Sequence, residues 1–203
     1  MLKVKQIFVE GTDKNFSYVL YDEESLEGAI IDPNGKIDRV FGFIEEQNLQ
    51  IKYLINTHSH HDHVEHNDLV KEKYRIKNAM HKDEPGRKDL SVDDSEEWKL
   101  GERPFQFLHT PGHSPGGLCI LADGQLISGD TLFVGRSGRT IFAGGSPGAM
   151  FQSMQSLSTL GDEVQIFPGH DYGDQPTSTI GRERKHNKCL RAKTVEEFKS
   201  LGI

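Results

Sequence analysis

The 203-residue chain has little cysteine, no long apolar run and no excess of positive charge. Two cysteines, Cys119 and Cys189, are too few for a disulfide framework, and the N-terminus carries no signal-like segment, so we expect a reducing, cytoplasmic location. Apolar runs such as Gly28–Ile31 and Tyr53–Ile55 are far shorter than the roughly 20 residues that cross a bilayer, so no membrane partner is expected. The net charge of −7 argues against nucleic acid as the main partner, because phosphate binding needs a basic face.

The composition is that of an ordinary globular protein, with 34% hydrophobic and 27% charged residues. The length allows one full core but is short for two, so we expect a single domain over residues 1–203. A homodimer is compatible with these numbers.

The local pattern predicts strands and helices that follow one another along the chain. Strands are expected at Val4–Val9, Phe16–Tyr21, Gly28–Asp32, Ile51–Asn56, Arg75–His81, Phe105–His109, Leu118–Leu121, Gln125–Ser128 and Val164–Phe167. Helices are expected at Lys36–Asn48, Asn67–Tyr74, Ala149–Leu160, Thr177–Leu190 and Val195–Leu201. The polar stretch Lys82–Glu102 is expected to be a surface connection with little regular structure, and Gly129–Gly148 to be irregular. This order indicates sheets flanked by helices.

Histidine is abundant, and four of the ten histidines lie within the six residues from His58 to His63. If the chain is extended there, His58, His60 and Asp62 share one face and converge, whereas His63 points elsewhere as a helix begins. Imidazole and carboxylate groups without thiolate are typical ligands of zinc, iron or manganese. The cluster therefore predicts part of a metal site.

Three later residues repeat the pattern of a polar side chain that follows an apolar strand. They are His113 in the turn after Phe105–His109, Asp130 after Gln125–Ser128, and His170 after Val164–Phe167. Loops at the ends of strands are where binding and catalytic sites assemble, so we expect these side chains to complete the metal site.

Four ordered motifs resemble those of the metallo-β-lactamase superfamily. They are Thr57–His63, Thr110–Ser114, Gly129–Phe133 and Pro168–Tyr172. The resemblance implies an α/β fold, a four-layer αββα sandwich with the metal centre at one edge of two sheets. It also implies two ligand sets joined by a bridging carboxylate: His58, His60 and His113 on one metal, Asp62, His63 and His170 on the other, and Asp130 between them. The cofactors would be two divalent metals, zinc or else iron or manganese. A metal-bridging hydroxide would be the nucleophile, and Asp62 and Asp130 the catalytic carboxylates.

Two branches of the superfamily fit these motifs. Glyoxalase II uses two metals to hydrolyse a thioester of glutathione, whereas persulfide dioxygenase uses one Fe(II) to oxidise glutathione persulfide. In the dioxygenase, the resemblance places the iron on His58, His113 and Asp130, a set of two histidines and one carboxylate that leaves positions open for oxygen and substrate. The other four residues would then surround the iron without binding it.

Several segments bear on this choice. Only 33 residues follow His170, too few for the helical extension of the larger glyoxalases, which is in keeping with dioxygenases and small hydrolases. Against the dioxygenase, its usual Arg-Thr-Asp reads Arg139-Thr140-Ile141, its His-Ala-Asp-His reads His60-His61-Asp62-His63, and Pro168-Gly169-His170 suits the hydrolases better. We therefore expect a glyoxalase II-like thioester hydrolase, with the dioxygenase as the alternative. β-Lactam hydrolysis is disfavoured, because the β-lactamases usually carry Cys where this chain has Asp130.

The expected substrate is a small glutathione-type or other thiol-linked molecule. By position in the resembling families, Arg139 and Tyr172 are the candidates for binding it, and arginine suits two-point capture of a carboxylate. A remaining alternative is a non-catalytic module stabilised by metal. Seven ligand-type positions argue against it, since a structural zinc needs four.

Overall fold

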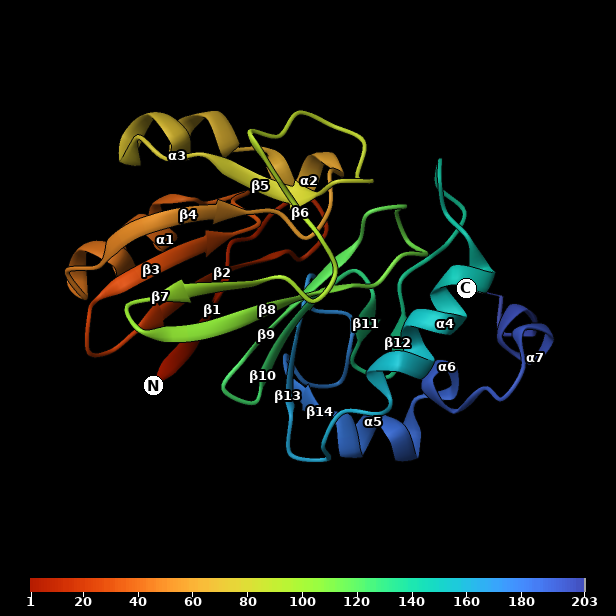
Figure 1. Ribbon diagram of the computed structural model, residues 1–203. Coiled ribbons are helices and arrows are strands. Elements are labelled where there is room, and N and C mark those ends of the chain that lie inside the picture. The colour runs from red at the N-terminus through yellow and green to blue at the C-terminus, as the bar shows by residue number, and fades with distance from the viewer. Residues whose placement is uncertain (203) are drawn as a thin grey trace.

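The computed structural model describes residues 1–202, in which two six-stranded sheets lie face to face between outer helices. Figure 1 shows α1 (Asp38–Glu46) and α3 (Asn67–Tyr74) on one side and α4 (Pro147–Leu157) with the C-terminal helices on the other. The predicted αββα sandwich is therefore confirmed.

The first sheet has the strand order β1-β2-β3-β4-β5-β6. Its strands are β1 (Leu2–Phe8), β2 (Phe16–Asp22), β3 (Glu27–Ile31), β4 (Gln50–Ile55), β5 (Asn78–His81) and β6 (Leu90–Val92). The first three form an antiparallel meander, and β3, β4, β5 and β6 pair in parallel. Parallel pairing requires crossover connections, which α1 supplies between β3 and β4, α3 between β4 and β5, and the loop 82–89 between β5 and β6.

The second sheet has the strand order β14-β13-β10-β9-β8-β7. Its strands are β7 (Glu97–Leu100), β8 (Arg103–His109), β9 (Leu118–Ala122), β10 (Gln125–Gly129), β13 (Gln165–Pro168) and β14 (Ser178–Thr179). The turn between β9 and β10 holds Asp123 and Gly124, both with positive φ, as a tight hairpin requires. Because β9 is antiparallel to both β8 and β10, and β13 is parallel to β10, the strands β8, β10 and β13 end at one edge.

The core lies between the two sheets and is built from alternate residues of each. Tyr18 and Leu20 of β2 meet Phe105 and Phe107 of β8, and all four are almost fully buried. Each such side chain contributes about 1.5–3 kcal/mol of burial free energy. Separate apolar clusters join each sheet to its outer helices, so both faces of both sheets are covered.

Helices begin and end where local signals place them. The helix α4 begins at Pro147, and the Ser146 hydroxyl accepts the amide hydrogen of Ala149, as an N-cap does. The remaining helices are the short α2 (His61–Val64), α5 (Ile180–His186), α6 (Lys188–Arg191) and α7 (Val195–Ser200).

The prediction that Lys82–Glu102 has little regular structure was wrong, because β6 and β7 lie within it. Each is an edge strand, which is hydrogen-bonded on one side only and needs few apolar residues. Because the apolar content is low, the sequence pattern did not indicate either strand. Trp98 of β7 packs against the core, with ring centroids 4.7 Å from Tyr53 and 5.2 Å from Phe107.

Two further predictions need correction. The segment Thr177–Leu190 is not one helix, because Asn187 has extended backbone (φ −78°, ψ 113°) and caps α6 by accepting the amide hydrogen of Cys189. The segment Gly129–Gly148, expected to be irregular, holds a small hairpin of β11 (Leu132–Phe133) and β12 (Arg136–Ser137).

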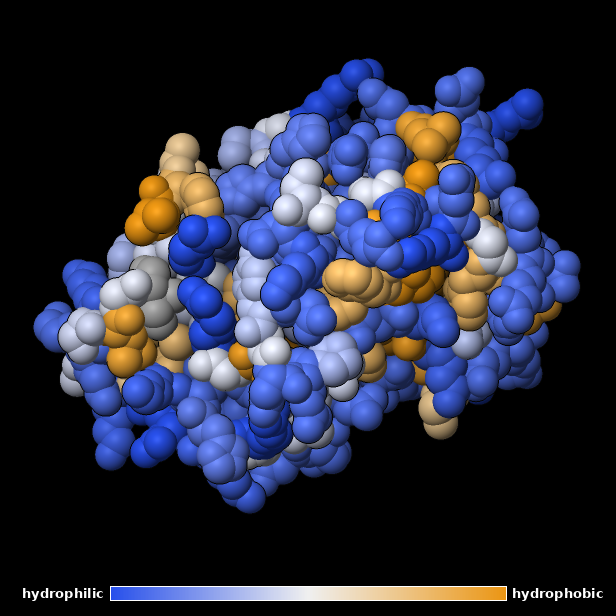
Figure 2. Space-filling view, turned by 180° about the vertical axis from the view of Figure 1, so that it is seen from behind, coloured by the Kyte–Doolittle hydropathy of each residue, from blue (hydrophilic) through white to orange (hydrophobic). Residues whose placement is uncertain are grey.

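The surface is mainly polar. Figure 2, which views the molecule from behind, shows a mostly hydrophilic face on which apolar residues form small separate groups. None of the helices within residues 1–202 is long and apolar enough to cross a membrane.

Candidate metal centre

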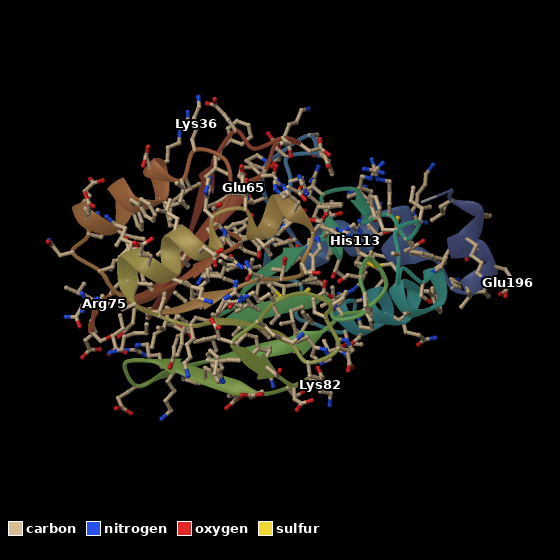
Figure 3. All side chains as sticks on the ribbon, turned by 90° about the horizontal axis from the view of Figure 1, so that it is seen from above. Lys36, Glu65, Arg75, Lys82, His113 and Glu196 are labelled. Atoms are coloured by element: carbon tan, nitrogen blue, oxygen red, sulfur yellow. The ribbon has the colours of Figure 1, made fainter. Side chains whose placement is uncertain are left out.

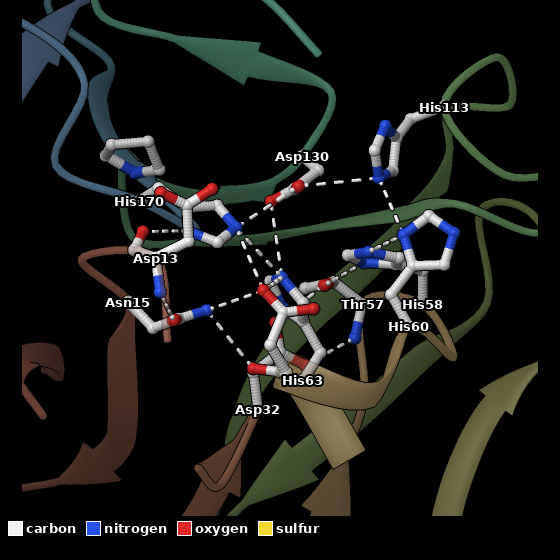
Figure 4. A network of polar contacts seen from close by, with 12 residues as sticks. Asp13, Asn15, Asp32, Thr57, His58, His60, His63, His113, Asp130 and His170 are labelled. Atoms are coloured by element: carbon white, nitrogen blue, oxygen red, sulfur yellow. Dashed lines mark hydrogen bonds and ion pairs between the residues drawn. The ribbon is translucent and has the colours of Figure 1, made fainter. Parts of the chain in front are cut away.

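The seven residues that the sequence singled out as metal ligands meet at one edge of the two sheets. His58 follows β4 of the first sheet, and Asp130 and His170 follow β10 and β13 of the second. His113 comes from the loop after β8, and seen from above it lies near the middle of the molecule, with Arg75 and Glu196 toward opposite ends (Figure 3). Figure 4 shows six of these side chains turned toward one another: His58, His60, His63, His113, Asp130 and His170.

The ligand atoms fall into overlapping groups in which all atoms lie within 4.8 Å of one another. These groups are His58, His60 and His113; Asp62, His63 and His170; and His58, His63 and Asp130. In the first group, His60 Nδ1 lies 3.0 Å from His58 Nε2 and 2.9 Å from His113 Nε2. The groups place the seven side chains as two sets that share a border.

Asp130 lies on that border. Its Oδ2 is 3.4 Å from His113 Nε2 and 3.3 Å from His170 Nε2, and its Oδ1 is 3.4 Å from His63 Nε2. Asp130 Oδ1 is buried and has no hydrogen-bond partner among the described residues. A buried carboxylate oxygen without a partner is costly, and a cation between the two histidine sets would satisfy it.

The outer nitrogens of three histidines are fixed by groups that only accept hydrogen bonds. His63 Nδ1 donates to Asp32 at 2.9 Å, while His113 and His170 donate to the carbonyl oxygens of Arg139 and Asp13, both at 2.7 Å. In its neutral form each ring therefore carries its proton on Nδ1 and directs an Nε2 lone pair at the cluster. This is how metal-binding histidines are oriented in proteins, and the donor set fits a divalent metal.

The charges within the cluster are strongly coupled. Burial alone would lower the pKa of His63, but the carboxylates of Asp130 and Asp32 outweigh it and raise the pKa to about 9. Burial would raise the pKa of Asp130, but His63 and His170 hold it well below its usual range. Burial, reinforced by His63, lowers the pKa of His58. Without a metal, the site therefore holds at least one proton on imidazole at neutral pH.

Asp32 positions this cluster and was not recognised in the sequence, where Asp32-Pro33 indicated only the end of a strand. Its Oδ2 accepts from His63 Nδ1 and from the hydroxyl of Thr57 (2.6 Å), and its Oδ1 accepts the Thr57 amide hydrogen (2.8 Å). The carboxylate thus ties the segment that carries His58 to the ring of His63.

Asn15 holds Asp62 in place. Its Nδ2 donates to Asp62 Oδ2 at 2.9 Å and to the Asp62 carbonyl at 3.2 Å. Burial would raise the pKa of Asp62, but His63 and the Asn15 hydrogen bond lower it, so the carboxylate is ionised at neutral pH.

Glu84 joins the two loops that carry histidines. Ser59, between His58 and His60, donates its amide hydrogen (2.8 Å) and its hydroxyl (2.7 Å) to Glu84 Oε1. On the other side, the hydroxyl of Ser114 (2.7 Å) and the amide of Gly116 (2.9 Å) donate to Oε2. The carboxylate is only 2% exposed and has four donors. No motif or spacing in the sequence indicated this role.

Two glycines allow the loops to approach so closely. A Cβ on Gly169 would lie 2.3 Å from Asp130 Oδ1, and a Cβ on Gly138 would lie 1.8 Å from the Asp130 carbonyl oxygen. Only a residue without a side chain fits at either position, which explains why residues 138 and 169 are both glycine.

The expectation that His58, His60 and Asp62 converge on one extended face was wrong. Since α2 begins at His61, the alternation stops there, and Asp62 turns to the group of His63 and His170. His63 does not point away but lies at the centre, in contact with Asp32 and Asp130.

A second group of possible ligands lies outside this centre, at His81, Asp83 and His109. The two imidazoles stack face to face, with centroids 3.7 Å apart and planes 11° from parallel. In-plane lone pairs of stacked rings run side by side and do not meet at one point. This group therefore packs the two sheets together and does not present a metal site.

A cavity of about 300 Å³ opens onto the metal cluster. The ligand side of its wall includes His60, Asp62, Asp130 and His170, and the outer wall includes Arg136, Arg139, Phe142 and Tyr172. The volume is at the lower end of the range for small-molecule sites. The two residues that the sequence suggested for substrate binding, Arg139 and Tyr172, thus lie at the cavity.

The sequence matches the metallo-β-lactamase superfamily over residues 12–88 and 83–170, which hold the first three motifs and the first three residues of the fourth. The chain belongs to this superfamily. The assignment agrees with the fold and with the metal-binding character of the cluster.

Relatives within the superfamily carry more than one activity. The chain is 31% identical to a probable polyketide biosynthesis zinc-dependent hydrolase, PksB, of Bacillus subtilis, over 91% of this chain and 85% of the relative. It is 30% identical to a hydroxyacylglutathione hydrolase of Pelagibacter ubique, over 88% and 76%. It is also 30% identical to the human mitochondrial persulfide dioxygenase ETHE1, over 98% and 80%.

Solved structures of similar fold include a protein named as ETHE1 and a protein that binds two irons. ETHE1 from Myxococcus xanthus superimposes with a TM-score of 0.90 at 28% identity, covering 99% of this chain and 92% of that one. TTHA1623 in a di-iron-bound form has a TM-score of 0.77 at 25% identity, with coverage of 90% and 98%. Since hydrolases and a dioxygenase match equally well, overall similarity does not select one reaction.

Proposed function

We propose that this protein is a hydrolase of glutathione-type thioesters that works with two divalent metals, zinc or else iron or manganese. The observation that carries the proposal is the position of Asp130, whose two oxygens reach toward both histidine sets. A carboxylate placed between two ligand sets suits a pair of cations. The first metal would be held by His58, His60 and His113, and the second by Asp62, His63 and His170.

The overall reaction is the addition of water to the thioester carbonyl and the cleavage of the carbon–sulfur bond, which gives a carboxylic acid and a free thiol. The bound metals would supply an acidic water and a positive charge that stabilises the developing oxyanion. No serine or cysteine nucleophile is required, and the thiol of Cys119 is buried, with its pKa raised to about 11 by burial.

The chain's own residues orient the reactants. Asp62 is held by Asn15 through one carboxylate oxygen and lies at the cavity wall, where it can orient water and take up its proton. Arg139 at the outer end of the cavity would bind the carboxylate of the thiol carrier. The carbonyl of Arg139 accepts from His113, so the substrate residue and a metal ligand are fixed to each other.

A second candidate is a persulfide dioxygenase with one Fe(II) on His58, His113 and Asp130. The close fold match with ETHE1 from Myxococcus xanthus favours it, as does the similarity to human ETHE1 along almost the whole chain. In that case His60, Asp62, His63 and His170 would support the iron site and would not hold a second metal.

One experiment with two substrates separates these candidates. Protein loaded with zinc, and separately with iron(II) without oxygen, is assayed for thiol release from S-D-lactoylglutathione and for oxygen uptake with glutathione persulfide. Metal content is measured on the same samples. About two metals per chain with thiol release supports the hydrolase. About one iron per chain, with persulfide-dependent oxygen uptake and no thiol release, would overturn it in favour of the dioxygenase.

A further inference from the structure

The hydroxyl of Tyr172 is already engaged within the protein. It donates to Asp13 Oδ2, and the ring lies parallel to the ring of His170 with centroids 4.8 Å apart. Phe133 contacts the same ring edge-on at 5.0 Å. Tyr172 is therefore a fixed platform in the cavity wall, and its hydroxyl is not free to bind a substrate.

That platform carries a guanidinium group. The Cζ of Arg136 lies 5.9 Å from the centroid of the Tyr172 ring, in the range of a cation–π contact. A second guanidinium, of Arg139, lies 5.4 Å from the centroid of Phe142. Both arginines are exposed and line the same cavity. Each cation is thus held over an aromatic ring beside the metal cluster.

Neither guanidinium forms an ion pair or a side-chain hydrogen bond within residues 1–202, although Asp13 and Asp62 line the same cavity. Arg39, Arg103, Arg182 and Arg184 pair with carboxylates, whereas Arg75, Arg87 and Arg191 also form no ion pair within residues 1–202. Arg136 and Arg139 differ from those three in that both line the cavity at the metal cluster. In a chain of net charge −7, two unpaired arginines in one cavity are available to an anionic ligand. Guanidinium groups bind carboxylate or phosphate through two parallel hydrogen bonds.

The backbone that carries both arginines is tied to the site. Arg136 is in the β11–β12 hairpin directly after Asp130, and its carbonyl accepts from Asn187 Nδ2 at 3.2 Å. The amide of Gly135 donates to Glu183 at 2.7 Å, which fixes the tip of the hairpin. The carbonyl of Arg139 accepts from the metal-site residue His113. Fixed backbones reduce the entropy that the protein would lose on binding an anion.

We propose that Arg136 and Arg139 form a two-point anion subsite and that Arg136 determines specificity by binding a second anionic group of the thiol carrier. The inference rests on the proposed function, because it takes the thioester end of the substrate to lie at the metal cluster. It assigns the substrate class as thioesters whose thiol carries two separate anionic groups. Carboxylates of a peptide thiol and phosphates of a nucleotide-linked thiol share this chemistry, and the test distinguishes them.

The kinetic test compares wild-type protein with Arg136→Gln, which removes the charge and keeps much of the side chain. The substrates are S-D-lactoylglutathione with two carboxylates, lactoyl-coenzyme A with phosphates, and the neutral lactoyl-N-acetylcysteamine. We expect Arg136→Gln to raise KM about tenfold for one of the two anionic substrates, S-D-lactoylglutathione or lactoyl-coenzyme A, while kcat stays within about twofold of the wild-type value. KM and kcat for the neutral substrate should equal those of the wild type. Arg136→Lys should recover part of the loss, and Arg191→Gln, on α6 away from the cavity, serves as the matched control.

The anionic substrate that loses affinity identifies the carrier: the glutathione thioester indicates carboxylates, and the coenzyme A thioester indicates phosphates. An equal rise in KM for the neutral substrate, or no change for either anionic one, would overturn the role of Arg136.

A binding measurement without turnover keeps this inference apart from the proposed function. Affinity of the metal-loaded protein is measured by calorimetry for S-methylglutathione, its diethyl ester and coenzyme A. We expect S-methylglutathione or coenzyme A to bind about tenfold more weakly to Arg136→Gln than to wild type, even if no thioester is hydrolysed. If no thioester is cleaved but this difference is found, the hydrolase proposal fails and the subsite stands. If thioesters are cleaved and the variants bind every ligand alike, the subsite fails and the hydrolase proposal stands.

Discussion

The carboxylate of Glu84 accepts a hydrogen bond from the hydroxyl of Ser114 at 2.7 Å, although the two residues are 30 positions apart. The other oxygen of Glu84 is bonded to Ser59, so one buried side chain connects the loop of His58 and His60 with the loop of His113. The distance between these histidines therefore depends on a residue that would touch neither metal nor substrate.

Replacement of Glu84 by Gln should weaken metal binding. An amide presents hydrogen atoms to donors that now face a carboxylate oxygen, so at least one side of the connection is lost. Supporting groups of this kind are worth about 10–100-fold in metal affinity. Affinity is measured by competition with a chelator, and folding is checked by circular dichroism. Ser114→Ala, which removes one of the four hydrogen bonds, should have a smaller effect, and equal metal affinity in all three proteins would contradict this role.

Metal binding should release a proton, and affinity should rise with pH up to about 9. The pKa of His63 is raised to about 9 by Asp130 and Asp32 against the effect of burial, whereas coordination requires its Nε2 lone pair. Calorimetric titration in buffers with different ionisation enthalpies measures the number of protons released. Zero protons released at pH 7 would show that His63 is already neutral.

The stability of the metal-free protein should fall as the pH rises, whereas its affinity for metal should increase. Because the pKa of folded His63 lies above its unfolded value of about 6.5, its contribution to stability is complete below that pH and disappears as the pH rises through about 9. Thermal unfolding of chelator-treated protein between pH 6 and pH 10 should give a falling Tm. Addition of zinc should remove or reverse this trend, which separates the His63 effect from general alkaline instability.

Asp130→Ala should lower kcat by at least about 100-fold and reduce the metal content, because it removes the group between the two histidine sets. Most of the fold should remain, since the cores between and outside the sheets do not involve this side chain. The assay on the identified substrate is accompanied by metal analysis. Full turnover in this variant is incompatible with the role proposed for Asp130.

Arg139→Ala should weaken a glutathione-type substrate mainly through KM. Its guanidinium is unpaired in the cavity, while its carbonyl, which holds His113, is unchanged by the substitution. Steady-state kinetics of wild type and variant give both constants. An unchanged KM would remove Arg139 from the substrate site, and a loss in kcat alone would indicate that the metal cluster had moved.

Much of the fold followed from local sequence. The β-branched and aromatic residues of Phe16–Tyr21 correspond to β2, and the helical spacing in Lys36–Asn48 corresponds to α1, whose buried face sets that period. The edge strands β6 and β7 could not be found in this way, because each is short, pairs on one side only and has few apolar residues. The pairing of β6 with β5 in parallel is also set by the assembled sheet and not by a local turn.

The candidate site, like the fold, was predictable from the sequence only in part. The sequence by itself determined which side chains could bind a metal, because four histidines within six residues and three strand-end ligands are chemically specific. The family resemblance also implied which of them share a group, whereas the expectation of an extended chain misplaced Asp62, because only the tertiary structure shows that α2 turns it away from His60. The tertiary structure also decided the roles of Asp32, Asn15 and Glu84. Asn15 and Asp32 bond across loops of the first sheet, whereas Glu84 joins a loop of the first sheet to one of the second. These residues are far apart in the chain, and only strand pairing and the packing of the two sheets bring them within 3 Å of their partners.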